Sequence, residues 1–108
     1  MLISFHPEAG AEIIEAAQFY EAREPGLGIE LLKEAQLLID RIAANPSAST
    51  KIGRRARWKS FRRFPYNIVY VPHPDRIRIV AFAHQKRHPF YWRKRLMSTA
   101  EDKGPTLT

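Results

Sequence analysis

Hydrophobic residues in the first half of the chain recur every three or four positions in two separate stretches. The first stretch covers residues 7–23, and the second covers residues 29–42. This spacing places the apolar side chains on one face of a helix. Glu24-Pro25-Gly26 separates the stretches and Asn45-Pro46 follows the second, and both breaks are typical of helix ends. The pattern therefore predicts two amphipathic helices joined by a short turn, an αα-hairpin.

The second half changes to a period of two residues, which is typical of strands. Strand-like runs cover residues 54–61, 66–72 and 76–84. Their connections are short, so we predict an antiparallel meander. Residues 46–53 are small and polar, and we expect a loop there.

Strict alternation along residues 76–84 predicts two different faces for this strand. One face carries Ile77, Ile79, Ala81 and Ala83. The opposite face carries Arg78, Val80, Phe82 and His84. We expect the helical hairpin to cover the first, apolar face.

A short apolar run at residues 2–5 precedes His6-Pro7 and indicates one more strand before the first helix. The expected fold is α+β, an N-terminal strand and an αα-hairpin packed on a small antiparallel sheet, in the order β-α-α-β-β-β. At 108 residues the chain has the size of one domain, which we assign to residues 1–97. The basic segment after residue 84 is expected along the sheet edge or as a helical turn. Residues 98–108 have no apolar periodicity and are expected to form a flexible tail.

Charge is distributed very unevenly along the chain. Residues 1–50 hold eight acidic and three basic residues, whereas residues 51–95 hold one acidic and fourteen basic residues. A concentrated basic surface attracts polyanions and raises their association rates. We therefore expect a nucleic acid or an acidic protein segment as partner.

Composition also limits the compartment and the chemistry. The chain has no cysteine, which excludes disulfides and thiolate zinc sites and favours a reducing compartment. Neither a signal peptide nor a membrane span is recognisable, so we expect a cytoplasmic protein without membrane contact. His84 and His88 have a spacing that suits a metal on a helix, but Pro89 follows and no third ligand is apparent. We expect no metal and no cofactor, and we expect His84 to hydrogen-bond to the backbone at a strand end.

Two spaced motifs give the chain a family resemblance. They are FPY-x-IVY at residues 64–70 and H-x-KR-x-P-x-YW-x-x-R at residues 84–95. With the order of elements, and with Pro7 and Pro25-Gly26-Leu27-Gly28 near the start, the chain resembles the RelE/ParE superfamily of bacterial toxins over residues 1–95. The resemblance implies a growth-inhibiting toxin of a type II toxin–antitoxin system, of the plasmid stabilisation type, that is neutralised by a cognate antitoxin. RelE-like members are ribosome-dependent mRNA endonucleases, and ParE-like members poison DNA gyrase.

The nuclease alternative requires cations for the phosphate and a residue for proton transfer. By resemblance to RelE-like enzymes, Arg63 and Arg87 are the candidate phosphate ligands, and the ends of the strands that carry them are expected to approach each other. Tyr91 or His88 is the candidate for proton transfer. The set has no acidic general base in residues 51–95, where Asp75 in a turn is the only acid. Arg87 has a structural alternative, stacking on Tyr91 or Trp92.

Aromatic and basic residues alternate in the second half, which is the mixture that stacks bases and neutralises phosphates. Most aromatic residues of a small sheet belong to its core, and we expect Trp58 and Trp92 to be the exposed ones. The candidate residues for binding the target or the antitoxin are Arg55, Arg57, Trp58, Arg62, Trp92, Arg93 and Arg95. We favour the ParE-like function on the C-terminal motif, with the mRNA endonuclease second and a non-toxic nucleic-acid-binding module third.

Overall fold

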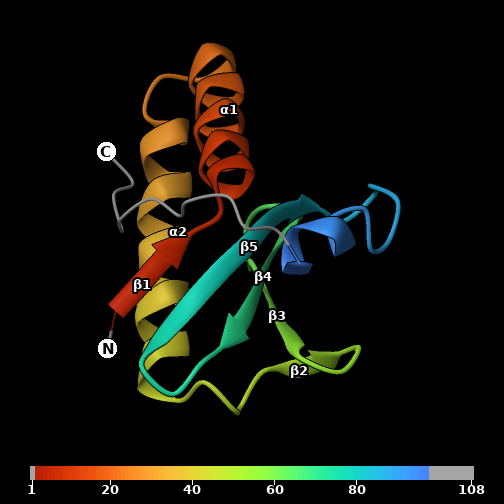
Figure 1. Ribbon diagram of the computed structural model, residues 1–108. Coiled ribbons are helices and arrows are strands. Elements are labelled where there is room, and N and C mark those ends of the chain that lie inside the picture. The colour runs from red at the N-terminus through yellow and green to blue at the C-terminus, as the bar shows by residue number, and fades with distance from the viewer. Residues whose placement is uncertain (1, 98–108) are drawn as a thin grey trace.

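Two helices lie against one face of a five-stranded sheet, and the C-terminal segment crosses the other face (Figure 1). This computed structural model describes residues 2–97, so the predicted tail at residues 98–108 lies outside the described part. In chain order the elements are β1 (Leu2–Phe5), α1 (Pro7–Arg23), α2 (Leu27–Ala44), β2 (Thr50–Ile52), β3 (Ala56–Ser60), β4 (Tyr66–Pro72), β5 (Arg76–His84) and the 3₁₀-helix η1 (Arg93–Met97). The strands are arranged as β1-β5-β4-β3-β2. The predicted α+β fold and its helical hairpin are confirmed.

The hairpin has clear local causes. Pro7 occupies the first turn of α1, and the side chain of His6 accepts a hydrogen bond from the Glu8 backbone N–H at 3.1 Å. Gly26 joins the helices with φ of 90°, a conformation that favours glycine. At Gly28 the helices approach so closely that a Cβ atom would collide with the Ala17 carbonyl oxygen. The helices therefore pack tightly near their connecting turn.

The sheet differs from the predicted meander in two ways. β1 pairs in parallel with β5, Leu2 opposite Arg76 and Phe5 opposite Ile79, so the sheet is mixed rather than antiparallel. β2 lies within the segment that we expected to be a loop, and it pairs with β3. Gly53, with φ of 71°, forms the turn between β2 and β3, which is why the predicted strand at residues 54–61 shrinks to Ala56–Ser60.

A β-bulge interrupts the alternation that we predicted for β5. Val69 pairs with Ala81 and Tyr70 pairs with Ile79, so Val80 is the extra residue. Beyond this point the two faces exchange. Phe82 joins Ile77 and Ile79 against the helices, whereas Ala81 and Ala83 face the opposite side, and the predicted assignment of these three residues was wrong.

Each face of the sheet consequently has its own hydrophobic core. The helix-side core contains the apolar stripes of α1 and α2, with Tyr70 and Phe82 from the sheet. The outer core contains Val69, Val80 and Ala81, and the segment after β5 covers it with Trp92. This segment includes the expected helical turn, but it crosses the sheet face instead of following an edge (Figure 1).

Trp92 is only 3% exposed, so the prediction that it is an exposed aromatic residue was wrong. The error has a physical reason, because β5 is apolar on both faces and the outer face needs a cover. Within residues 2–97, no helix is long and apolar enough to cross a membrane.

Candidate functional site

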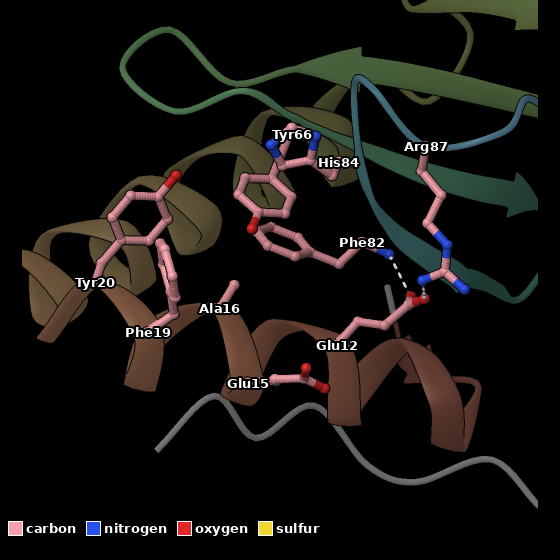
Figure 2. Close-up of a pocket in the computed structure, with 9 residues that line it drawn as sticks. All are labelled: Glu12, Glu15, Ala16, Phe19, Tyr20, Tyr66, Phe82, His84 and Arg87. Atoms are coloured by element: carbon pink, nitrogen blue, oxygen red, sulfur yellow. Dashed lines mark hydrogen bonds and ion pairs between the residues drawn. The ribbon is translucent and has the colours of Figure 1, made fainter. Parts of the chain in front are cut away.

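A mostly buried carboxylate on α1, that of Glu12, contacts several side chains from the C-terminal segment. Glu12 accepts hydrogen bonds from the hydroxyl of Tyr91 (2.7 Å) and from Nη1 and Nη2 of Arg95 (both 2.9 Å). The Phe82 backbone N–H donates to the same carboxylate at 3.0 Å, and Nη1 of Arg87 lies 3.7 Å from it. Figure 2 shows Glu12 facing Phe82 and Arg87 at one end of a hollow between α1 and the sheet. We call Glu12, Arg87, Tyr91 and Arg95 the Glu12 cluster.

The core of the cluster is a bidentate ion pair that is almost completely removed from water. The Glu12 and Arg95 side chains are 14% and 9% exposed. Arg95 also donates to the carbonyl oxygen of Val80 at 3.0 Å and lies 3.2 Å from the exposed Glu8 carboxylate. The Arg95 guanidinium therefore has partners on α1 and on β5. Arg95 was predicted as a binding residue for a partner. In the structure it is buried, and its contacts join α1 to the C-terminal segment.

Tyr91 is fixed as a hydrogen-bond donor. Burial, followed by the hydrogen bond to Glu12, raises the pKa of Tyr91 well above its usual value. Its hydroxyl therefore remains protonated at neutral pH and points at a carboxylate that already has several donors. The predicted role of Tyr91 in proton transfer has no geometric support in this arrangement.

Arg87 has the stacking that was its structural alternative. Its guanidinium carbon lies 3.9 Å from the centroid of the Tyr91 ring, and its side chain remains 55% exposed. It is the only member of the cluster that is more than half exposed, so Arg87 is the part of the cluster most accessible from outside.

Glu12 is the residue that sequence reasoning missed. It lies three residues after Ala9 and four before Ala16, both of which are buried, so it falls within the apolar stripe of α1. A carboxylate at such a position needs cationic or donor partners. The excess of basic residues at positions 51–95 indicated where such partners of Glu12 could come from.

Arg63 does not join the cluster. The strand ends beside Arg63 and Arg87 do approach each other, as predicted, because Tyr66 pairs with His84. The two arginine side chains nevertheless have different partners.

The Arg63 side chain pairs with Glu30 of α2 at 2.7 Å in an exposed position. The backbone N–H groups of Arg62 and Arg63 donate to Glu34 of the same helix. These contacts hold the loop between β3 and β4 on α2, in a hollow that Arg87 does not line.

The remaining predicted residues lie around the outer face of the sheet and its edge. Arg55 contacts the Met97 sulfur at 3.5 Å, and Arg57 donates to the Ser49 carbonyl oxygen at 2.7 Å. Trp58 is 36% exposed, as expected. His88 and Arg93 are exposed on the C-terminal segment. His84 accepts a hydrogen bond from the Lys86 backbone N–H at 3.0 Å, which confirms its predicted backbone bond.

A model of the family described as the ParE toxin of the type II toxin–antitoxin system parDE matches residues 3–89. The match covers both helices and all the long strands, and it includes Glu12 and Arg87. It ends before Tyr91 and Arg95, which complete the Glu12 cluster. No curated protein matches the chain.

Proposed function

Because the chain belongs to the ParE toxin family of type II toxin–antitoxin systems, we propose that it inhibits growth by binding DNA gyrase and not by cleaving mRNA. The observation that carries the proposal is the Tyr91 hydroxyl, which donates to the buried Glu12 carboxylate at 2.7 Å. A residue that serves in proton transfer works best with a pKa near the operating pH and with access to the reacting group. Tyr91 has neither property.

The other members of the cluster support the same reading. The Glu12 carboxylate accepts from Arg95, Tyr91 and the Phe82 backbone, so its oxygens are occupied and it is a poor general base. Arg63 and Arg87 lie in separate hollows and do not converge on one phosphate. These contacts therefore support a role in binding more than a role in catalysis.

The charge of the surface fits a complex that contains DNA. Arg55, Arg62 and Arg93 are exposed, and the only acid in residues 51–95 is Asp75, in the turn between β4 and β5. We propose Arg55, Trp58, Arg62, Arg87 and Arg93 as the residues that contact gyrase or its DNA. Trp92 and Arg95 are withdrawn from this set because they are buried.

The family implies a cognate antitoxin as partner. Ile29 and Leu37 of α2 are 55% and 47% exposed, so the acidic half of the chain also offers apolar surface. We propose that the antitoxin covers such apolar surface in addition to neutralising basic residues, because apolar contacts survive the salt that screens charges.

Expression of the chain without antitoxin tests the function, and Tyr91→Phe separates the two mechanisms. The substitution removes only the hydroxyl and keeps the ring under Arg87. A gyrase-binding toxin is expected to stay toxic, with the loss of a hydrogen bond to a charged group worth about 1.5–3 kcal/mol in stability. A nuclease that used Tyr91 for proton transfer would lose about 10²-fold or more in rate.

The measurements are growth arrest, gyrase-dependent DNA breaks and cleavage of translated mRNA, each for the parent chain and for Tyr91→Phe. DNA breaks with both chains are expected. Cleavage of mRNA by the parent chain, abolished in a folded Tyr91→Phe protein, would identify a RelE-like endonuclease instead.

Arg87→Ala is expected to remove most of the toxicity while the protein remains folded. The Arg87 side chain is 55% exposed and its ion pair with Glu12 is long, at 3.7 Å, so its loss should cost about 1 kcal/mol or less. Growth arrest and urea unfolding measure the two effects. Arg76→Ala is the control. Arg76 is the first residue of β5 and also forms an ion pair near the surface, with Asp75 of the preceding turn. Full toxicity of a folded Arg87→Ala protein would remove Arg87 from the contact set.

A further inference from the structure

The outer face of the sheet carries a third hollow, which Arg87 and Tyr91 of the Glu12 cluster line on one side. It has a volume of about 420 Å³ and lies between β3, the first half of β4 and the turn that follows β5. Trp58, Ser60, Asn67, Gln85, His88 and Phe90 are among its lining residues. This volume falls within the range of about 300–1,000 Å³ that is common for ligand sites. We call it the outer hollow.

Two partly exposed rings belong to its lining. Trp58 is 36% exposed and Phe90 is 38% exposed. Phe90 has φ of 64°, the only positive φ among the non-glycine residues that the structure describes. A bulky residue in this conformation is strained by about 1 kcal/mol or more. The strained residue, Phe90, is the one whose ring lies beside the hollow. The centroid of this ring is 5.5 Å from that of the buried Trp92 ring.

Three polar side chains that line the hollow hydrogen-bond to one another. The Oδ1 atom of Asn67 accepts from the Ser60 hydroxyl at 2.7 Å and from the Gln85 amide nitrogen at 3.5 Å. Both bonds use the oxygen of Asn67, so its amide nitrogen is left as a donor and the Gln85 oxygen as an acceptor. Such a pair of oriented amides matches the hydrogen-bonding edge of a nucleobase.

The charge around the hollow is suited to phosphate. Arg87 and His88 line it, Arg93 lies 5.1 Å from the Phe90 ring centroid, and Lys86 is exposed beside them. No acidic side chain of residues 2–97 lines the outer hollow. Rings, oriented amides and exposed cations therefore occur together within one short stretch of surface.

We propose that the outer hollow binds an unpaired base of a single-stranded nucleic acid, with the base stacked on Phe90 or Trp58 and the adjoining phosphates next to Arg87 and Arg93. Stacking on aromatic side chains combined with a basic groove is the usual way in which proteins hold single strands. A base inside a duplex is already stacked and cannot enter a hollow of this kind. This binding rests on the proposed function in one respect, since the DNA in the cell would be supplied by the gyrase complex. The binding itself is independent of gyrase.

The test uses fluorescently labelled 12-nucleotide strands and the purified toxin, with fluorescence anisotropy as readout. The probes are oligo(dT), oligo(rU), an abasic strand of equal length and a duplex. The toxin is expected to bind at least one of the two single strands about tenfold or more tightly than the abasic strand, because stacking is lost with the base. The stronger of the two single strands identifies the DNA or the RNA form of the ligand.

Phe90→Ala is expected to weaken binding of that strand about 5- to 100-fold and to leave binding of the abasic strand unchanged. Arg93→Ala is expected to weaken both strands and to lower the slope of log K against log salt by about 0.7, as for one lost phosphate contact. Phe19→Ala is the matched control, because Phe19 is also an exposed phenylalanine beside an arginine, with Arg23 at 4.5 Å, but lies on α1 outside the outer hollow. Phe19→Ala should bind like the parent chain.

Equal binding of the abasic and base-containing strands would overturn the proposal, and so would a folded Phe90→Ala protein that binds like the parent. Tighter binding of the duplex than of either single strand would also overturn it. None of these results would contradict the proposed binding of gyrase, because the anisotropy experiment contains no gyrase. Loss of gyrase-dependent breaks with intact strand binding would instead refute the proposed function alone.

Discussion

Glu12→Ala is expected to lower the free energy of unfolding by about 3–5 kcal/mol, because it leaves the Arg95 guanidinium buried without its bidentate partner. The hydroxyl of Tyr91 loses its acceptor in the same variant. Domains of this size have total stabilities of about 5–15 kcal/mol, so the loss is a large fraction of the whole. The toxin is expected to lose its activity by unfolding at growth temperature.

Glu8→Ala provides the matched control for this prediction. Glu8 lies on the same helix and contacts the same arginine at 3.2 Å, but its side chain is 66% exposed. Exposed pairs contribute about 0–1 kcal/mol. Urea unfolding of both variants checks the difference, and equal stabilities of the two proteins would show that burial adds nothing to the pair.

The Glu12 cluster shows which contacts could be predicted from the sequence and which could not. The two helices, β4 and β5 follow from apolar spacing and from prolines at the breaks, since these signals are local. The partner of Glu12 is 83 positions away, and no local pattern selects Arg95 from fourteen bases in residues 51–95. The unusual position of Glu12 within an apolar stripe was visible, but its partner was not.

The errors in the sheet have similar causes. β2 has three residues and a polar sequence, so its pairing with β3 determines it more than its own propensity does. The bulge at Val80 inserts one residue and exchanges the faces of everything that follows, which an alternating pattern cannot reveal. The resulting outer face needs a cover, and this is why Trp92 is buried while Trp58, near the edge of the sheet, is not.

Trp92→Ala is expected to destabilise the fold by about 3–5 kcal/mol and to abolish toxicity for that reason. Its ring is 3% exposed and covers the outer core formed by Val69, Val80 and Ala81. A truncation here leaves a cavity on the face that the C-terminal segment must hold. We expect Trp92→Phe, which keeps an aromatic ring, to recover much of the stability.

Thermal unfolding followed by far-UV circular dichroism measures these effects, with Trp58→Ala as the comparison at a partly exposed tryptophan. The stability loss of Trp58→Ala should be well below that of Trp92→Ala. If Trp92→Ala is as stable as the parent chain and still loses toxicity, Trp92 contacts the target after a rearrangement, and its original assignment as a binding residue is restored.

The parallel pairing of β1 with β5 has a consequence for synthesis on the ribosome. Residues 2–5 find their partners at residues 76–79, and until these appear β1 has no strand beside it. At about 5–20 residues per second, the wait for roughly 70 residues lasts about 4–14 s. The nascent chain can form its helical hairpin early, since that contact is local. The pairing of β1 with β5, which completes the sheet, follows late. The complete sheet can therefore form only after most of the chain has been synthesised. An antitoxin that recognises the complete five-stranded sheet has to bind it after translation.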